Sequence, residues 1–172
     1  MKARTLRRSA ASAQRFIPAS GDLTEFVEAL ARSRGRPTVL LGVAFDAEAP
    51  SGVWIVTDKR DYIAYPNDAS AARKAAIVCH EVAHMLLGHD PPPGTEGLAS
   101  LAASEAPTLD LAVAIRLLAR HGYASEQEAD AEGLGTRLAA ELARREIPGG
   151  CAVLLHGEPG GGTHGGAGVD AE

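Results

Sequence analysis

The residues best suited to chemistry in this chain are 80–84, which read HEVAH and so form an HExxH pattern. Two histidines four residues apart lie on the same face of an α-helix, with Cβ atoms about 6 Å apart, so both rings can reach one metal ion. A glutamate beside the first histidine can serve as general base toward a water activated by the metal. The pattern predicts His80 and His84 as metal ligands and Glu81 as the base. A chance pattern on a core helix is the alternative.

A catalytic zinc site takes three protein ligands, so one ligand lies elsewhere in the chain. Candidates are His89, an acid of the loop 90–107 (Glu96 or Glu105), and an acid of the last helix. His89 follows His84 by five residues, which is about 140° around a helix, so we expect it to face away from the metal. At a helix C-terminus a partial positive charge on it would be favourable. The metzincin pattern, with a third histidine six residues after the second, is not met.

Acidic residues are concentrated at the start of the last predicted helix, where residues 125–132 read SEQEADAE. The apolar stripe of this helix consists of Ala131, Leu134, Leu138 and Leu142. Because successive residues turn by about 100°, Glu128 and Asp130 lie at the edge of the stripe, with Glu126 and Glu132 further round. Glu128 is therefore the acid best placed to face inward. Ser125 and Glu128 also fit a capping box, and spacing alone leaves the ligand and cap interpretations both open.

The elements that must position these residues predict an α+β fold that is mainly helical. Asp22, with Glu25 three residues later, is typical of a helix start, and we expect this helix to end near residue 34. The helix that carries HExxH is predicted from about residue 70 to about residue 88. Two further helices are predicted over 108–122 and 126–145.

Three short runs rich in β-forming residues, 38–45, 53–57 and 62–65, lie between the first helix and the HExxH helix. Their connections are short, which favours an antiparallel meander. The sequence therefore predicts a small three-stranded antiparallel sheet packed beside the HExxH helix.

Composition indicates one domain, which we place at 21–148 of the 172 residues. Residues 1–20 are predicted to be a disordered basic arm, and the Gly-rich residues 149–172 a disordered tail. The net charge of −5 offers no electrostatic basis for nucleic-acid binding. No export signal and no run of 18 apolar residues is present. Cys79 and Cys151 are far apart and a disulfide is not expected, so we predict a cytoplasmic protein with no membrane partner.

In two motifs the chain resembles the ImmA/IrrE family of bacterial metallopeptidases. The first is residues 80–89, HEVAHMLLGH, and the second is residues 126–130, EQEAD. The order of predicted elements over residues 22–146 is also similar to that of the family. The resemblance implies a gluzincin-like site in which His80 and His84 are ligands, Glu81 is the base and Glu128 is the third ligand.

The chain departs from the family pattern around the second motif. Asp130 stands where the family usually has Asn, and a role for it behind the metal ligands is one interpretation. Glu132 and Gly133 stand where the family usually has Phe-Ala.

These patterns together predict a zinc-dependent endopeptidase, with manganese as another possible metal. Glu81 would take a proton from the attacking water and pass it to the leaving amine. His121 and Tyr123 are candidate donors to the oxyanion. The resemblance implies that the substrate is a helix-turn-helix repressor or an antitoxin-type regulator in stress or mobile-element regulation. The alternatives are a non-catalytic partner-binding or toxin–antitoxin module and a nucleic-acid regulator that uses residues 2–15.

Overall fold

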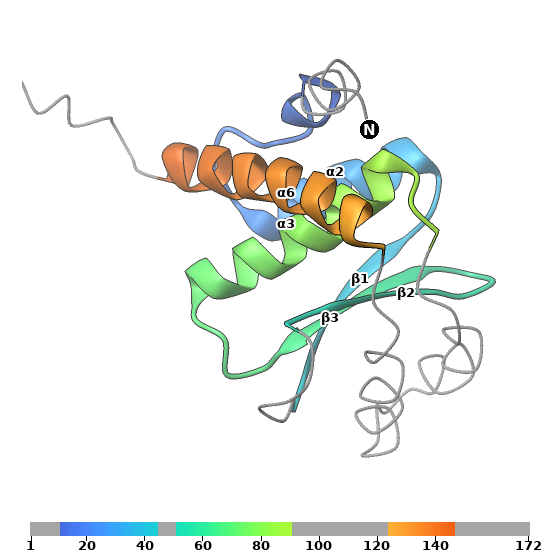
Figure 1. The fold of residues 1–172 in the computed structure, drawn as a ribbon. Helices are drawn as coiled ribbons and strands as arrows, with labels where there is room; N and C mark the ends of the chain where they lie inside the picture. Colours follow the sequence, from blue (N-terminus) through green and yellow to red (C-terminus); the bar gives the residue numbers. More distant parts are fainter. Residues whose placement is uncertain (1–10, 45–50, 91–123, 147–172) are drawn as a thin grey trace, which may run out of the picture.

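A computed structural model describes residues 11–44, 51–90 and 124–146 of the chain. The main elements in these ranges are α2 (Leu23–Arg34), β1 (Thr38–Val43), β2 (Val53–Val56), β3 (Asp61–Pro66), α3 (Ala71–Leu87) and α6 (Ser125–Glu146). Figure 1 shows the small sheet on one side of α3 and α6 on the other. The predicted α+β class, mainly helical, is confirmed.

The helices begin and end where their capping residues predict. The Asp22 side chain accepts a hydrogen bond of 2.8 Å from the Glu25 backbone N–H at the start of α2. Ser70 does the same for the Arg73 N–H at the start of α3, at 3.3 Å. Gly88 ends α3 in the left-handed conformation, with φ of 68°, which glycine adopts without steric cost. The predicted bounds of the HExxH helix are therefore confirmed.

The sheet is mixed, which corrects the predicted antiparallel meander. β3 is the central strand, and β2 pairs with it antiparallel from Val53↔Ala64 to Val56↔Asp61. β1 pairs with the other edge of β3 in parallel, from Thr38↔Asp61 to Val43↔Pro66. An apolar run indicates a strand but carries no information on which neighbour the strand takes, and here the connection from β1 leads to the far edge of the sheet.

An ion-pair cluster at Asp61 accounts for the parallel pairing. The fully buried Asp61 carboxylate accepts hydrogen bonds from Arg34 Nη1 at 2.7 Å and from Arg36 Nε at 2.6 Å. The Asp61 backbone N–H donates to the Pro37 carbonyl at 2.8 Å. These bonds tie the end of α2 and the start of β1 to the start of β3. The two strands therefore begin at the same end of the sheet.

The hydrophobic core extends further toward the N-terminus than predicted. Ala13 and Ile17 are buried in the same core as Val78 and Leu138. Arg145 on α6 donates a hydrogen bond to the Ile17 carbonyl. The predicted disordered arm over 1–20 is thus too long, because apolar side chains at 13 and 17 pack against the helices. Residues 1–10 and the predicted tail 149–172 lie outside the described residues.

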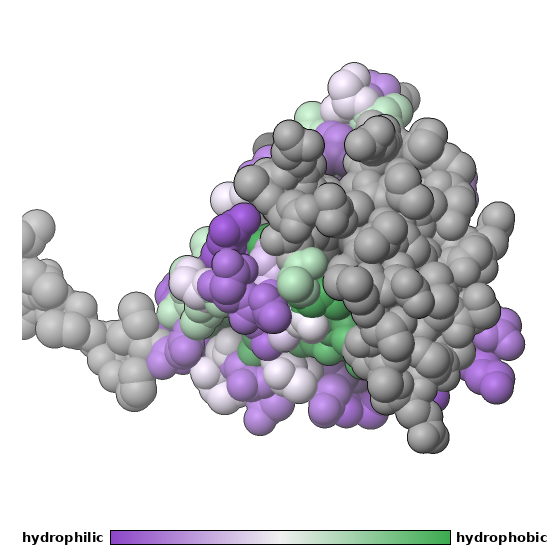
Figure 2. All heavy atoms as spheres, turned by 90° about the horizontal axis from the view of Figure 1, so that it is seen from below, coloured by the Kyte–Doolittle hydropathy of each residue, from purple (hydrophilic) through white to green (hydrophobic). Residues whose placement is uncertain are grey.

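On the face shown in Figure 2, hydrophobic side chains of the described residues are visible in a small area beside hydrophilic ones. In the described ranges, no helix has the length and apolarity needed to span a bilayer. The predicted loop from residue 91, the predicted helix 108–122 and Cys151 lie outside the ranges that the structure describes.

Candidate metal centre

The two histidines of the HExxH pattern lie together on α3, as their spacing predicts. The Nε2 atoms of His80 and His84 are 3.0 Å apart. The His84 side chain is fully buried, whereas 21% of the His80 side chain is exposed. Both rings therefore present the same nitrogen to one point at the edge of the core.

Glu128 of α6 completes the group. Its Oε2 lies 3.3 Å from His80 Nε2, and its Oε1 lies 3.8 Å from His84 Nε2. Ser125 is already the first residue of α6, and the Glu128 N–H donates to the Ala124 carbonyl at 3.0 Å. Ala124 therefore occupies the N-cap position, one residue before Ser125. The capping-box interpretation of Ser125 and Glu128 is wrong. The carboxylate is directed at the two histidines instead.

The apolar stripe of α6 brings Glu128 to this position. Ala131, Leu134, Leu138 and Leu142 are all buried, as predicted. Gly135 sits in the same face, and a Cβ built on it would lie 2.8 Å from His80 Cα. The glycine allows α6 to approach the backbone of α3 closely. Glu128 precedes Gly135 by seven residues, or about two turns, so it lies on the same side of α6.

The geometry and donor chemistry fit a metal ion. Ligand atoms of His80, His84 and Glu128 all lie within 4.8 Å of one another. Zinc–ligand bonds of about 2.0–2.1 Å in a tetrahedron put ligand atoms about 3.3 Å apart, close to the separations found here. Burial, followed by the charges of His80 and His89, lowers the pKa of His84 to about 3. Its imidazole is therefore neutral at neutral pH, as metal coordination requires.

Glu81 directly follows His80 in α3 and is 5% exposed. Burial and the nearby Glu128 carboxylate raise the pKa of Glu81 to about 8, while a hydrogen bond from the Trp54 backbone N–H lowers it. A divalent cation at the three ligands would oppose the effect of burial on this pKa. The start of β2 is close by, since a Cβ on Gly52 would lie 3.2 Å from Glu81 Oε1. The environment of Glu81 is thus formed jointly by α3 and the sheet.

His89 is in contact with the group, although not as a ligand. Its Nδ1 lies 2.9 Å from His84 Nδ1, and its side chain is buried. We predicted that His89 would lie at the helix C-terminus and face away from the two histidines; the position is confirmed, but the ring turns back onto His84. Gly88 ends α3 before His89, so the histidine does not continue the helical rotation. Burial lowers the pKa of His89, against the opposing charges of Asp130 and Glu128.

Glu132 is a second neighbour that the sequence did not single out. Its Oε2 lies 3.4 Å from His80 Nδ1, the nitrogen that faces away from Glu128. Two signals in the sequence could have pointed to the contacts of His89 and Glu132. The glycine directly before His89 is typical of a helix end. Glu132 follows Glu128 by four residues, so the two lie on the same face of the helix.

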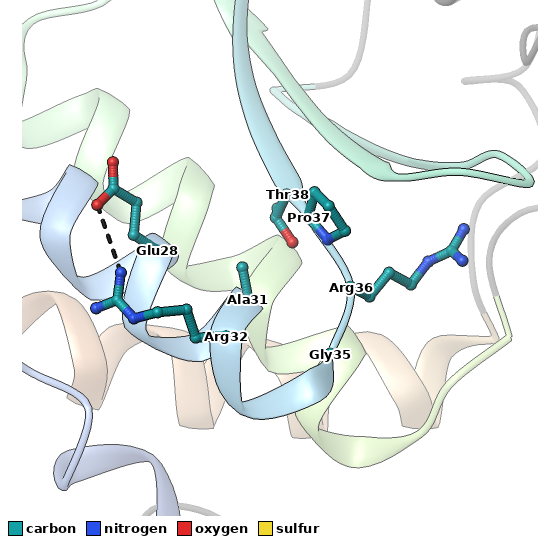
Figure 3. Close-up of a pocket in the computed structure, with 7 residues that line it drawn as sticks. All are labelled: Glu28, Ala31, Arg32, Gly35, Arg36, Pro37 and Thr38. Atoms are coloured by element: carbon teal, nitrogen blue, oxygen red, sulfur yellow. Dashed lines mark ion pairs between the residues drawn. The ribbon is translucent and has the colours of Figure 1, made fainter.

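Other candidates do not rival this group. A pocket between the end of α2 and the start of β1 is lined by Glu28, Ala31, Arg32, Gly35, Arg36, Pro37 and Thr38. Figure 3 shows Glu28 paired with Arg32, at 3.7 Å, and Arg36 directed away from them. Burial raises the pKa of the Cys79 thiol to about 12, so it is a core residue and no nucleophile. Glu96, Glu105, His121, Tyr123, His156 and His164 lie outside the described residues.

Comparison of the chain with protein-family models, with curated proteins and with solved structures gave no match. Function is therefore inferred from the residues of the site and from the two sequence motifs.

Proposed function

We propose that this protein is a zinc-dependent endopeptidase with His80, His84 and Glu128 as metal ligands and Glu81 as general base. The observation that carries the proposal is the convergence of Glu128, from a separate helix, on the two histidines of an HExxH helix. Three protein ligands of the type His, His and carboxylate are the set used by catalytic zinc in peptidases. The same group would accept manganese.

Zinc held by these ligands would supply a Lewis acid that polarises the scissile carbonyl and lowers the pKa of water. Glu81 would accept the proton of the attacking water and return it to the leaving amine. Its pKa of about 8 is that of the metal-free site, and a bound cation would lower it toward neutral pH, where a group that both takes and gives a proton works best. The hydrogen bond from Trp54 would hold the Glu81 carboxylate in place.

The substrate and location follow from the resemblance alone. Similarity of residues 80–89 and 126–130 to the ImmA/IrrE pattern supports a cytoplasmic peptidase that cleaves a helix-turn-helix repressor or an antitoxin-type regulator. The two motifs lie side by side in the fold, with 3.3 Å between the Glu128 carboxylate and His80 Nε2. The sequence alone could not give this distance.

A non-catalytic module that binds a regulator through the same metal-stabilised fold is the second candidate. One observation favours it: Glu81 is almost fully buried and its carboxylate already bonds the Trp54 N–H. In such a module Glu81 would fix the sheet to α3 and would not contact water.

The deciding experiment measures zinc content and peptide cleavage for the wild-type chain, Glu81→Gln, His84→Ala and Glu128→Ala. Substrates are a fluorogenic peptide library and the helix-turn-helix protein encoded nearest to this chain. We expect Glu81→Gln to keep its zinc and lose cleavage, and the two ligand variants to lose both. A wild type that binds no metal would overturn the metal site. Zinc binding with no cleavage, or with equal cleavage by Glu81→Gln, would overturn the catalytic role of Glu81.

A further inference from the structure

We propose that Glu132 and His89 are positioning residues that hold the two histidine ligands in the tautomer and ring orientation that metal binding needs. The proposal deepens the metal site proposed above and rests on it. Each residue contacts the Nδ1 atom of one ligand, on the side opposite to Glu128. Neither residue belongs to the ligand set.

The orientation of the His80 and His84 rings identifies the nitrogen atoms that would bind a metal. His80 and His84 both turn Nε2 toward Glu128, so Nε2 is the nitrogen whose lone pair would bind the metal. In a neutral imidazole only one nitrogen carries a proton. Metal binding through Nε2 therefore requires the proton on Nδ1 of both rings. A hydrogen-bond acceptor at each Nδ1 would favour this tautomer.

Glu132 supplies that acceptor for His80. An ionised carboxylate can only accept hydrogen bonds, so the 3.4 Å contact with Oε2 favours a proton on His80 Nδ1. The other oxygen of Glu132 accepts a hydrogen bond of 3.2 Å from Thr136 Oγ1, one turn further along α6. Thr136 thereby limits the rotation of an otherwise exposed side chain. α6 thus delivers a ligand, Glu128, and a partner for another ligand four residues later.

His89 supplies the acceptor for His84. The two Nδ1 atoms are 2.9 Å apart, so one of them donates and the other accepts. If His84 Nδ1 carries the proton, it donates a hydrogen bond to His89 Nδ1. The proton of the neutral His89 ring then lies on Nε2. The His89 ring is buried and turns Nδ1 toward His84, so a neutral His89 ring can accept a hydrogen bond at this nitrogen. The turn at Gly88 is what directs this ring back to His84.

The two partners differ in environment, and their effects should differ in size. The His84–His89 contact is buried, whereas 72% of the Glu132 side chain is exposed. Loss of a partner behind a metal-binding histidine typically weakens metal affinity about 10–100-fold. We expect His89 substitutions at the upper end of that range and Glu132 substitutions at the lower end, because water screens the exposed pair.

The test uses the full chain in two measurements. In zinc-loaded protein, proton and nitrogen-15 NMR of the imidazoles reports whether each Nδ1–H is held in a hydrogen bond. In a second measurement, competition with a chromogenic chelator gives the affinity for zinc. The variants are Glu132→Leu and His89→Phe, which remove the acceptor, and Glu132→Gln and His89→Asn, which keep an oxygen that can accept. Glu146→Gln, an equal loss of charge at the far end of α6, is the control.

We expect the zinc-loaded wild type to show hydrogen-bonded Nδ1–H groups on His80 and His84. Glu132→Leu should remove this hydrogen bond at His80 and leave that of His84 unchanged, and His89→Phe should do the reverse. Zinc affinity should fall in both variants, recover in part in Glu132→Gln and His89→Asn, and stay unchanged in Glu146→Gln. If His89→Phe does not fold, His89→Asn and Glu132→Leu still decide the proposal.

The outcomes separate this inference from the metal site itself. Wild-type Nδ1–H signals and zinc affinity in Glu132→Leu and in the His89 variants would overturn the positioning role while leaving the metal site intact. A wild-type chain that binds no zinc would overturn the proposed function, and the positioning of metal ligands would fall with it. Loss of the Nδ1–H hydrogen bond in Glu132→Leu without a change in zinc affinity would also overturn the inference, because that hydrogen bond would then not matter to the metal.

Discussion

Gly135 of α6 lies directly against the backbone of His80 on α3, the residue that begins the HExxH pattern. A Cβ at position 135 would come within 2.8 Å of His80 Cα and 3.0 Å of His80 N. The close approach of α6 to α3 therefore depends on the absence of a side chain at position 135. The distance from Glu128 to the histidines depends on it too, because Glu128 lies about two turns from Gly135 on the same helix.

Replacement of Gly135 by alanine should separate the two helices. Because the added methyl group would meet helix backbone, which cannot move aside cheaply, we expect a loss of about 1–3 kcal/mol in unfolding free energy. Zinc affinity should fall as well, since Glu128 moves with α6. Gly133→Ala is the matched control, because a Cβ there meets nothing within 4 Å. It should stabilise α6 by about 0.5–1 kcal/mol. Equal effects of the two substitutions in urea denaturation would contradict this account.

Gly52→Ala should disturb Glu81 specifically. A Cβ there would collide with Ile77 and lie 3.2 Å from Glu81 Oε1 and 3.3 Å from the Ala64 carbonyl. We expect a loss of about 1–3 kcal/mol in stability from overpacking and a reduced cleavage rate with zinc content retained. Gly42→Ala serves as control, because its nearest contacts would be at an ordinary 3.5 Å. A Gly52→Ala protein as active and stable as Gly42→Ala would argue against close packing of β2 on Glu81.

Asp61→Asn should destabilise the fold far more than loss of a surface pair. Asp61 is fully buried and holds Arg34 and Arg36, whose side chains are 27% and 29% exposed. Each bond to a charged group contributes about 1.5–3 kcal/mol, and the partial exposure of the arginines reduces the total, so we expect a loss of about 3 kcal/mol. Glu28→Gln, which removes the exposed pair with Arg32, should change stability by no more than about 0.5 kcal/mol. Thermal and urea denaturation of both variants would measure the difference.

The stability of the metal-free protein should depend on pH through Glu81. Burial, then the charge of Glu128, raises its pKa in the folded state from 4.5 to about 8. The protonated carboxyl therefore favours folding, with a contribution that is complete below pH 4.5 and is lost as the pH rises through about 8. Glu81→Gln mimics the neutral form, so its stability should fall less than that of the wild type between about pH 5 and pH 9.

His84 acts in the opposite sense, and the comparison of Glu81→Gln with the wild type removes its contribution. Burial lowers its pKa from 6.5 to about 3, so its stabilisation is present above pH 6.5 and is lost toward acid. Because His84 is present in both proteins, the difference in their unfolding free energies, measured by urea denaturation in chelator at several pH values, isolates Glu81. A difference that does not change with pH would show that Glu81 is ionised in the folded protein.

Local sequence patterns were sufficient for the helices α2, α3 and α6 and for the direction of most of their side chains. Asp22 caps α2 as predicted, and α3 has the predicted bounds, with caps at Ser70 and Gly88, because a cap depends on residues within one turn. The shared face of His80 and His84 follows from the helical repeat alone. The placement of Glu128 at the edge of a buried stripe was also readable from the sequence, since that stripe lies within one helix.

Contacts between distant segments were decided by the tertiary structure. Two ion pairs to the buried Asp61 support the pairing of β1 with β3. Arg34 and Arg36 lie 27 and 25 positions away from Asp61, and no strand pattern reports contacts at that separation. The approach of Glu128 to the two histidines depends on where α6 docks, and Gly135 sets that distance. The partners of His80 and His84 at Nδ1 depend on a turn at Gly88 and on the exposed side of α6. Helical periodicity fixes where a side chain points on its own helix, whereas only packing determines what lies there to meet it.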